Sequence, residues 1–245
     1  MATTDLENAD LAGLETQIAE MANAQFDSPH FRRFLALKFT KARAQTYIIQ
    51  RTHWTTNRRC CWAHAQGSAP LDVKTLIWEH EREELEGKPE IGLDDHHTLS
   101  IKEGGLVGLV PEDFVRIPPS DGATTCMLAW LHLATHSHWL SALAASAALE
   151  LSNSEDVLTG ASMSRRIGEK MAADLGIPLK EQPSNSEHMV ADIEHGRILM
   201  IVARNHARTP EAQEHLLAGL RDSWAIDRVW KGQLADLLEA LPDED

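Results

Sequence analysis

Apolar residues recur every three to four positions along most of the chain. The pattern runs through residues 31–50, 72–87, 125–151, 165–177, 188–207 and 209–241. This spacing places the apolar side chains on one face of an α-helix. No stretch between turn signals shows sustained alternation with a period of two, which would indicate a β-strand. The pattern therefore predicts an all-α protein.

Glycine and proline interrupt this pattern at 67–70, 87–95, 116–122 and 176–187. The connectors are short, none is of low complexity, and no internal repeat is visible. Short connections between periodic segments favour one bundle of helices packed against their neighbours. We therefore expect a single domain over 1–245, a bundle of about seven helices, with 1–25 as an N-terminal helix or arm.

The composition indicates how large a core the bundle can bury and in which compartment the protein is expected. The 245 residues are 43% apolar, which is enough for a substantial core. No run of 18 apolar residues occurs, and the N-terminus is acidic and amphipathic, unlike a signal peptide. The 3 cysteines cannot build an extracellular disulfide framework. We expect a cytoplasmic protein with reduced thiols and no membrane partner.

The charge argues against a nucleic-acid partner. The formal net charge of −14 repels a phosphate backbone. One arginine cluster, Arg58 and Arg59, is too small to reverse this repulsion. We expect a small-molecule substrate instead.

The segment "HMVADIEH" carries His188, Asp192 and His195 at offsets of four and three. On a helix these offsets place the three side chains on one face, within reach of a common point. A metal site and a solvated polar face both fit this triplet. Glu150 follows the run "ALAASAAL", whose helix is predicted to be mostly buried, so its carboxylate needs a cation or a donor unless it faces water at the helix end.

An acidic strip precedes a pair of histidines. Glu79, Glu83 and Glu86 recur at helical spacing, and His96 and His97 follow a glycine-containing turn. Most of this strip is interpreted as a solvated face, and one glutamate that points inward would complete a ligand set. Carboxylates and histidines on separate helices are typical of iron or manganese sites in helical bundles.

Two other motifs compete with this interpretation. The stretch "HEREE" begins like the zinc metalloprotease motif but has Glu84 where the second histidine must stand, which excludes that site. The stretch "CCWAH" places a cysteine near a histidine, without the acid and aromatic partners of a thiaminase nucleophile. A thiaminase-like enzyme is therefore kept only as an alternative.

The order glutamate, histidine, glutamate, then H-x-x-x-D-x-x-H resembles the haem-oxygenase-like diiron oxidases and oxygenases, whose bundle is shared with TenA and PqqC proteins. The resemblance covers most of the chain beyond about residue 70. It includes "EELEG", "HHTL" and "VGLVPEDF", followed by "RIPPSDGATT" and "ALAASAALELSNSE". The fold that it implies is a single haem-oxygenase-like, TenA/PqqC-like bundle.

The resemblance also implies a cofactor of two Fe(II) ions, with O2 as co-substrate. It implies no catalytic residue beyond the metal ligands. The segment between the glutamate and the histidine is longer than in the family, so substitutes are kept for these two ligands. The implied ligands are Glu83, His96, Glu150, His188, Asp192 and His195, with Glu79, Glu84 and His97 as substitutes.

The function that follows is that of a non-haem diiron, O2-dependent oxidase or oxygenase. Its expected substrate is a small amine- or carboxylate-bearing metabolite such as an amino acid, oxidised by N-oxygenation, desaturation or C–C cleavage. A homodimer and an external electron donor are both compatible with this class. The alternatives are a TenA-like, metal-independent hydrolase and a non-catalytic helical binding module.

Overall fold

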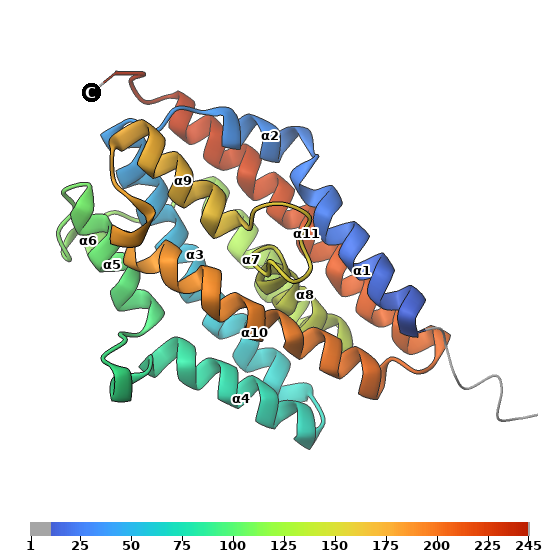
Figure 1. The fold of residues 1–245 in the computed structure, drawn as a ribbon. Helices are drawn as coiled ribbons and strands as arrows, with labels where there is room; N and C mark the ends of the chain where they lie inside the picture. The colour runs from blue at the N-terminus through green and yellow to red at the C-terminus, as the bar shows by residue number, and fades with distance from the viewer. Residues whose placement is uncertain (1–10, 245) are drawn as a thin grey trace, which may run out of the picture.

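Helices account for all the regular elements of the computed structural model, which describes residues 11–244 (Figure 1). The all-α prediction is confirmed, whereas the predicted count of about seven helices is wrong, since eleven α-helices lie within this range. They are α1 (Leu11–Phe26), α2 (Pro29–Ala36), α3 (Lys41–Ser68), α4 (Leu71–Glu86), α5 (His96–Leu106), α6 (Asp113–Arg116), α7 (Asp121–His136), α8 (Trp139–Leu151), α9 (Met163–Leu175), α10 (Pro183–His206) and α11 (Pro210–Glu239), with 3-10 turns at Pro89–Ile91 and Leu179–Glu181.

The count differs because short breaks do not disturb the hydrophobic period. The periodic segment 125–151 contains α7 and α8, which are separated at the extended residue Ser137. His138 caps α8, and its ring accepts a hydrogen bond from the Leu140 N–H. Similarly, Thr40 caps α3 and separates it from α2. A break of two to four residues leaves the buried face nearly in register, so periodicity alone does not reveal it.

Helix α8 lies at the centre of the bundle. Every residue from Leu140 to Leu151 is buried. Alanine and serine fill much of this helix, and their small side chains let α3, α7, α10 and α11 pack directly against it (Figure 1). The longest helix, α11, makes the most extensive of these contacts.

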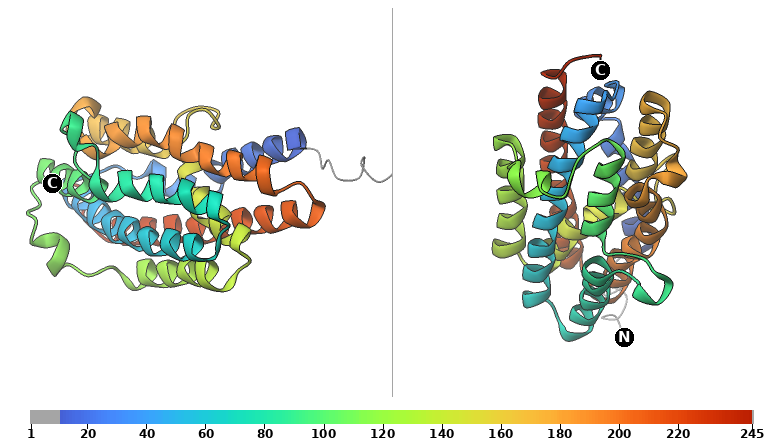
Figure 2. Two further views of the ribbon diagram at one scale, coloured as in Figure 1. Left: turned by 90° about the horizontal axis from the view of Figure 1, so that it is seen from below. Right: turned by 90° about the vertical axis from the view of Figure 1, so that its left-hand side faces the viewer.

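Helix α4 lies along one side of the bundle, between α3 and α10 (Figure 2, left). Helix α5 follows it and packs against both α3 and α10. Some polar side chains of α3, α4, α5, α8 and α10 meet in the region between these helices.

The N-terminal helix α1 is part of the packed bundle. Its buried residues Leu14, Ile18 and Ala22 belong to the same apolar cluster as Trp62 and Trp224. Helix α1 begins at Leu11, residues 1–10 lie outside the described residues, and the N-terminal helix or arm over 1–25 stays a prediction. The assignment of 1–245 to a single domain stays a prediction. Within 11–244 no helix combines the length and apolar content needed to cross a bilayer.

The closest approach of α8 and α11 depends on a glycine. A Cβ at Gly219 would lie 2.2 Å from the Ser141 carbonyl oxygen. The Ser141 hydroxyl also donates to the His215 carbonyl at 2.7 Å, which holds the two helices together. We predict that Gly219→Ala lowers the free energy of unfolding by about 1–3 kcal/mol, the usual cost of overpacking. Urea unfolding followed by circular dichroism measures this loss.

Gly67 provides the matched control. It lies near the end of α3, and a Cβ there would meet no atom within 4 Å. Because alanine favours the helix by up to about 1 kcal/mol, Gly67→Ala should leave stability unchanged or raise it. An equal loss of stability in both variants would show that the α8–α11 contact is not as tight as described.

Candidate metal centre

Helix α4 contributes the first two side chains of the centre. His80 and Glu84 are four residues apart, so they share one face of the helix, and both are buried. The distance from His80 Nε2 to Glu84 Oε1 is 3.8 Å. The His80 ring packs against the Trp62 ring, with 4.6 Å between centroids, and its Nδ1 lies 3.0 Å from Glu81 Oε1.

Glu150, in the last turn of α8, brings a second carboxylate to the same place. It is 4% exposed, and its Oε1 lies 3.3 Å from His80 Nε2. The Arg58 guanidinium donates a hydrogen bond to the same carboxylate. The alternative of a helix-end glutamate facing water is therefore wrong.

Helix α10 contributes Asp192 and His195, one turn apart. Asp192 is fully buried, and neither of its carboxylate oxygens has a hydrogen-bond partner among the described residues. His195 Nδ1 lies 3.4 Å from Asp192 Oδ1 and 3.4 Å from Glu84 Oε1. A solvated polar face is thus excluded for both residues.

His188 and His96 complete the arrangement, with 4.4 Å between their ring centroids. His188 Nδ1 lies 2.7 Å from the Ser184 carbonyl oxygen, which can only accept, so Nδ1 carries the proton and Nε2 keeps its lone pair. Burial and the neighbouring His96 lower the pKa of His188 to about 3, so its ring is neutral at pH 7. His96 Nδ1 lies 3.0 Å from Glu84 Oε2.

We call these seven side chains the histidine–carboxylate cluster. One ligand atom from each of four of them lies within 4.8 Å of the other three. Many of the nitrogen and oxygen atoms in the cluster have no hydrogen-bond partner within 11–244, including both ring nitrogens of His96 and of His195. The cluster comprises His80, Glu84, His96, Glu150, His188, Asp192 and His195.

The implied ligands and their substitutes lie in different surroundings. Glu84 and His96 are buried in the cluster, whereas Glu79 and His97 are exposed. Glu83 pairs with Lys88, with 2.6 Å between its Oε1 and Nζ, and the same Oε1 reaches His195 Nε2 only at 3.8 Å. The geometry thus favours the substitute Glu84 over Glu83, and His96 over His97.

His80 is absent from the ligands implied by the sequence. The sequence feature that could have identified His80 is its offset of four from Glu84, which places both side chains on one helix face. In the sequence, the same stretch lacks the second histidine of the zinc metalloprotease motif, so it does not by itself indicate a metal ligand. The packing of α4 against α3 and α10 turns this face inward.

Two arginines of α3, the buried Arg58 and the half-buried Arg59, also belong to this region and were not predicted from the sequence. Arg58 pairs with Glu150, and Arg59 Nη1 lies 2.7 Å from Glu84 Oε2 and 2.9 Å from Glu81 Oε1. Burial opposes ionisation of Glu84, but Arg59 and His96 outweigh it and hold the pKa of Glu84 well below its ordinary value.

The pKa values of His80 and Asp192 are also shifted by their surroundings. Burial lowers the pKa of His80, but its close contacts with the Glu150 and Glu81 carboxylates outweigh burial and raise that pKa to about 9. Burial raises the pKa of Asp192 to about 6. In the absence of a metal, the buried carboxylates are therefore balanced by Arg58, Arg59 and protonated histidine.

The chain is similar to several solved structures, although no family model and no curated protein matches it. A CADD-like protein of unknown function from Nostoc punctiforme superposes with a TM-score of 0.72 at 20% identity, over 93% of this chain and 98% of that one. A domain of unknown function with a heme oxygenase-like fold from Shewanella denitrificans gives a TM-score of 0.70 at 16% identity, over 95% and 93%.

A TenA family transcription regulator from Silicibacter sp. gives a TM-score of 0.61 at 12% identity, over 95% of this chain and 99% of that one. At these identities the comparisons establish the fold and leave the activity open. The chain therefore has a haem-oxygenase-like fold, similar to those of CADD-like and TenA-family proteins, as the resemblance in its sequence implied.

Proposed function

We propose that this chain is a non-haem diiron enzyme, an O2-dependent oxidase or oxygenase that acts on a small organic metabolite. The observation that carries the proposal is the buried histidine–carboxylate cluster. Four histidines and three carboxylates from four helices meet there, and many of their polar atoms have no partner among the described residues.

Unpartnered buried polar atoms fit a metal centre. Each buried donor or acceptor that lacks a partner costs about 1–3 kcal/mol, and more if it is charged. His96, His195 and Asp192 together leave six such atoms. A bound cation would satisfy the carboxylate oxygens and the one lone pair of each neutral imidazole, which removes most of this cost.

The donor chemistry favours iron. Neutral imidazole and carboxylate ligands suit Fe(II), and no cysteine belongs to the cluster as described. When bound, two iron ions would supply the electrons that activate O2. The residues proposed to hold them are Glu84, His96, Glu150, His188, Asp192 and His195, with His80 as an additional donor.

The surrounding residues would prepare this site. The Ser184 carbonyl orients the His188 ring through Nδ1–H, so that Nε2 is the free donor. Trp62 covers His80 and shields it from water. Arg59 contacts both Glu84 and Glu81, so it would keep Glu81 as its ion-pair partner when Glu84 binds a metal ion.

A thiol-dependent hydrolase is less well supported. Burial raises the pKa of both Cys61 and Cys126 to about 11, which leaves little thiolate at neutral pH. The third thiol, that of Cys60, is exposed and lies outside the cluster. A non-catalytic module would have no evident reason to bury so many ionisable groups.

Anaerobic titration with Fe(II) tests the proposal. We expect the purified chain to bind two Fe(II) ions and the loaded protein, unlike the metal-free protein, to consume O2. The bound iron is measured by calorimetry and elemental analysis, and O2 by an electrode. Binding of less than one Fe(II) per chain would exclude a diiron enzyme.

The choice between two neighbouring glutamates gives a second prediction. Glu84→Gln should weaken Fe(II) binding by at least about 10–100-fold, the loss seen even when a group that supports a ligand is removed. Glu83→Gln makes the same chemical change one position away and should alter the affinity little. Calorimetric titration measures the Fe(II) affinity of both variants. A larger loss of affinity in Glu83→Gln than in Glu84→Gln would identify Glu83 as the ligand.

Arg59 gives a third prediction, because it competes with a metal ion for Glu84. Arg59→Gln should bind Fe(II) several-fold more tightly than the original chain. The metal-free variant should melt at a lower temperature, because the buried Glu84 loses a partner. Calorimetry and thermal unfolding measure the two effects.

Arg82→Gln is the control for this change. Arg82 lies on α4 over the exposed Trp78 ring and does not touch the cluster. It should leave both the Fe(II) affinity and the melting temperature unchanged. If Arg59→Gln weakens Fe(II) binding instead, Arg59 supports the metal site and does not compete with it.

A further inference from the structure

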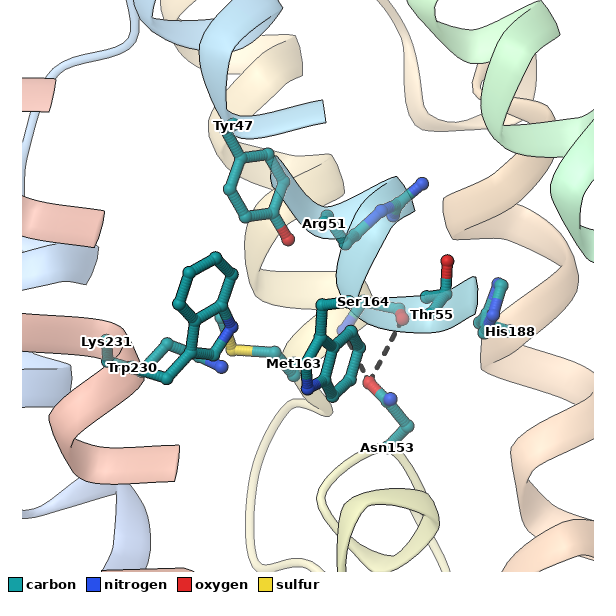
Figure 3. A pocket seen from close by; sticks show the side chains of 10 residues that line it. Tyr47, Arg51, Thr55, Asn153, Met163, Ser164, His188, Trp230 and Lys231 are labelled. Atoms are coloured by element: carbon teal, nitrogen blue, oxygen red, sulfur yellow. Dashed lines mark hydrogen bonds between the residues drawn. The ribbon is translucent and has the colours of Figure 1, made fainter. Parts of the chain in front are cut away.

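A pocket opens beside the histidine–carboxylate cluster, between α3, α9, α10 and α11 (Figure 3). It contains about 490 Å³ of space free of protein atoms, part of it open to solvent. In Figure 3, Trp230 and Lys231 lie across the cavity from His188. Because His188 belongs to both the pocket and the cluster, a molecule in the pocket would lie next to the proposed irons.

The charge of the pocket wall has one sign. Of the described residues that line the pocket, Arg51 and Lys231 are cations and none is a carboxylate. Their counterions lie behind the wall: Asp227 Oδ1 is 2.7 Å from Lys231 Nζ, and Glu103 Oε1 is 3.4 Å from Arg51 Nη2. In a chain with a net charge of −14, a wall that presents only cations favours an anionic ligand.

Two N–H donors on pocket residues lack acceptors. Arg51 Nε and Trp54 Nε1 are buried and have no hydrogen-bond partner within the described chain. Arg51 is only 8% exposed, and its terminal nitrogens are held by Ser184 and Asn185. This network fixes the guanidinium. A carboxylate has two acceptor oxygens, which are the groups that these donors lack.

The rest of the wall suits an apolar body and offers little to an ammonium group. Trp54, Trp230 and Met163 provide aromatic and thioether surface. The Asn153 Oδ1 atom already accepts from the backbone N–H and the hydroxyl of Ser164, at 2.9 and 3.0 Å. An amino acid would therefore place its ammonium group near two cations without a carboxylate to pair with it.

We infer that this pocket binds the substrate, and that the substrate is a small organic carboxylate with an aromatic or branched apolar body and no ammonium group. The inference rests on the proposed function, since it takes the cluster beside the pocket as the reacting centre. It narrows the expected substrates from amines and carboxylates to carboxylates alone.

Binding of three probes with the same phenyl ring and similar length tests the inference. Phenylacetate is an anion at pH 7, phenylacetamide is neutral, and 2-phenylethylamine is a cation. Calorimetry with the full chain, both metal-free and Fe(II)-loaded, should show that phenylacetate binds at least 10-fold more tightly than the other two. Equal affinities, or a preference for the amine, would overturn the inference.

Trp54→Phe locates the binding site. It keeps an aromatic ring but removes the N–H donor, so phenylacetate should bind about 10-fold more weakly, as expected for loss of one hydrogen bond to a charged group. Trp78→Phe makes the same change at a Trp that is 56% exposed on α4, away from the pocket, and should have no effect. Unchanged binding to Trp54→Phe would place the ligand elsewhere.

The Fe(II) titration keeps the two proposals separate. If two irons bind but phenylacetate is not preferred, only the assignment of the substrate fails. If phenylacetate is preferred and weakened by Trp54→Phe while no iron binds, the pocket is a carboxylate site and the diiron proposal fails.

Discussion

The cost of burying charged groups is the constraint on which this structure depends. Glu84, Glu150 and Asp192 lie in the interior, where an unpaired carboxylate is strongly unfavourable. The negative charge of these carboxylates is compensated by Arg58 and Arg59 from α3 and by histidines from α4, α5 and α10. This arrangement needs four or more helices in fixed positions, so the polar centre and the helix packing require each other.

The composition of α8 lets the neighbouring helices pack close to this polar centre. Its alanine and serine side chains leave room for the helices around it, and Gly219 lets α11 approach Ser141 closely. Glu150, at the end of this small-residue helix, therefore lies deep in the bundle and within reach of α3 and α4. A helix of large side chains would have kept the carboxylates of α4 and α8 farther apart.

The polar residues of helix α10 belong to two neighbouring sites, the cluster and the pocket. Asp192 and His195 are buried with the carboxylates, whereas His188 also lines the neighbouring pocket. The start of the same helix is held by Arg51, through Ser184 and Asn185. Arg51 thus lies in the pocket wall and also fixes the turn whose carbonyl orients His188. Ligand binding and metal binding are expected to be coupled through this turn.

The sequence alone determined the helical class and placed His188, Asp192 and His195 on one helix face, because these follow from the helical period. Only the tertiary structure decided that Asp192, His195 and Glu150 are buried, because burial depends on which helices pack over them. Only the tertiary structure decided that α4 turns His80 and Glu84 inward instead of Glu83. Neighbouring positions on a helix differ by about 100°, and the packing of α4 against α3 and α10 sets its rotation. The same holds for Arg58 and Arg59, since the sequence cannot show that their partners come from helices far along the chain.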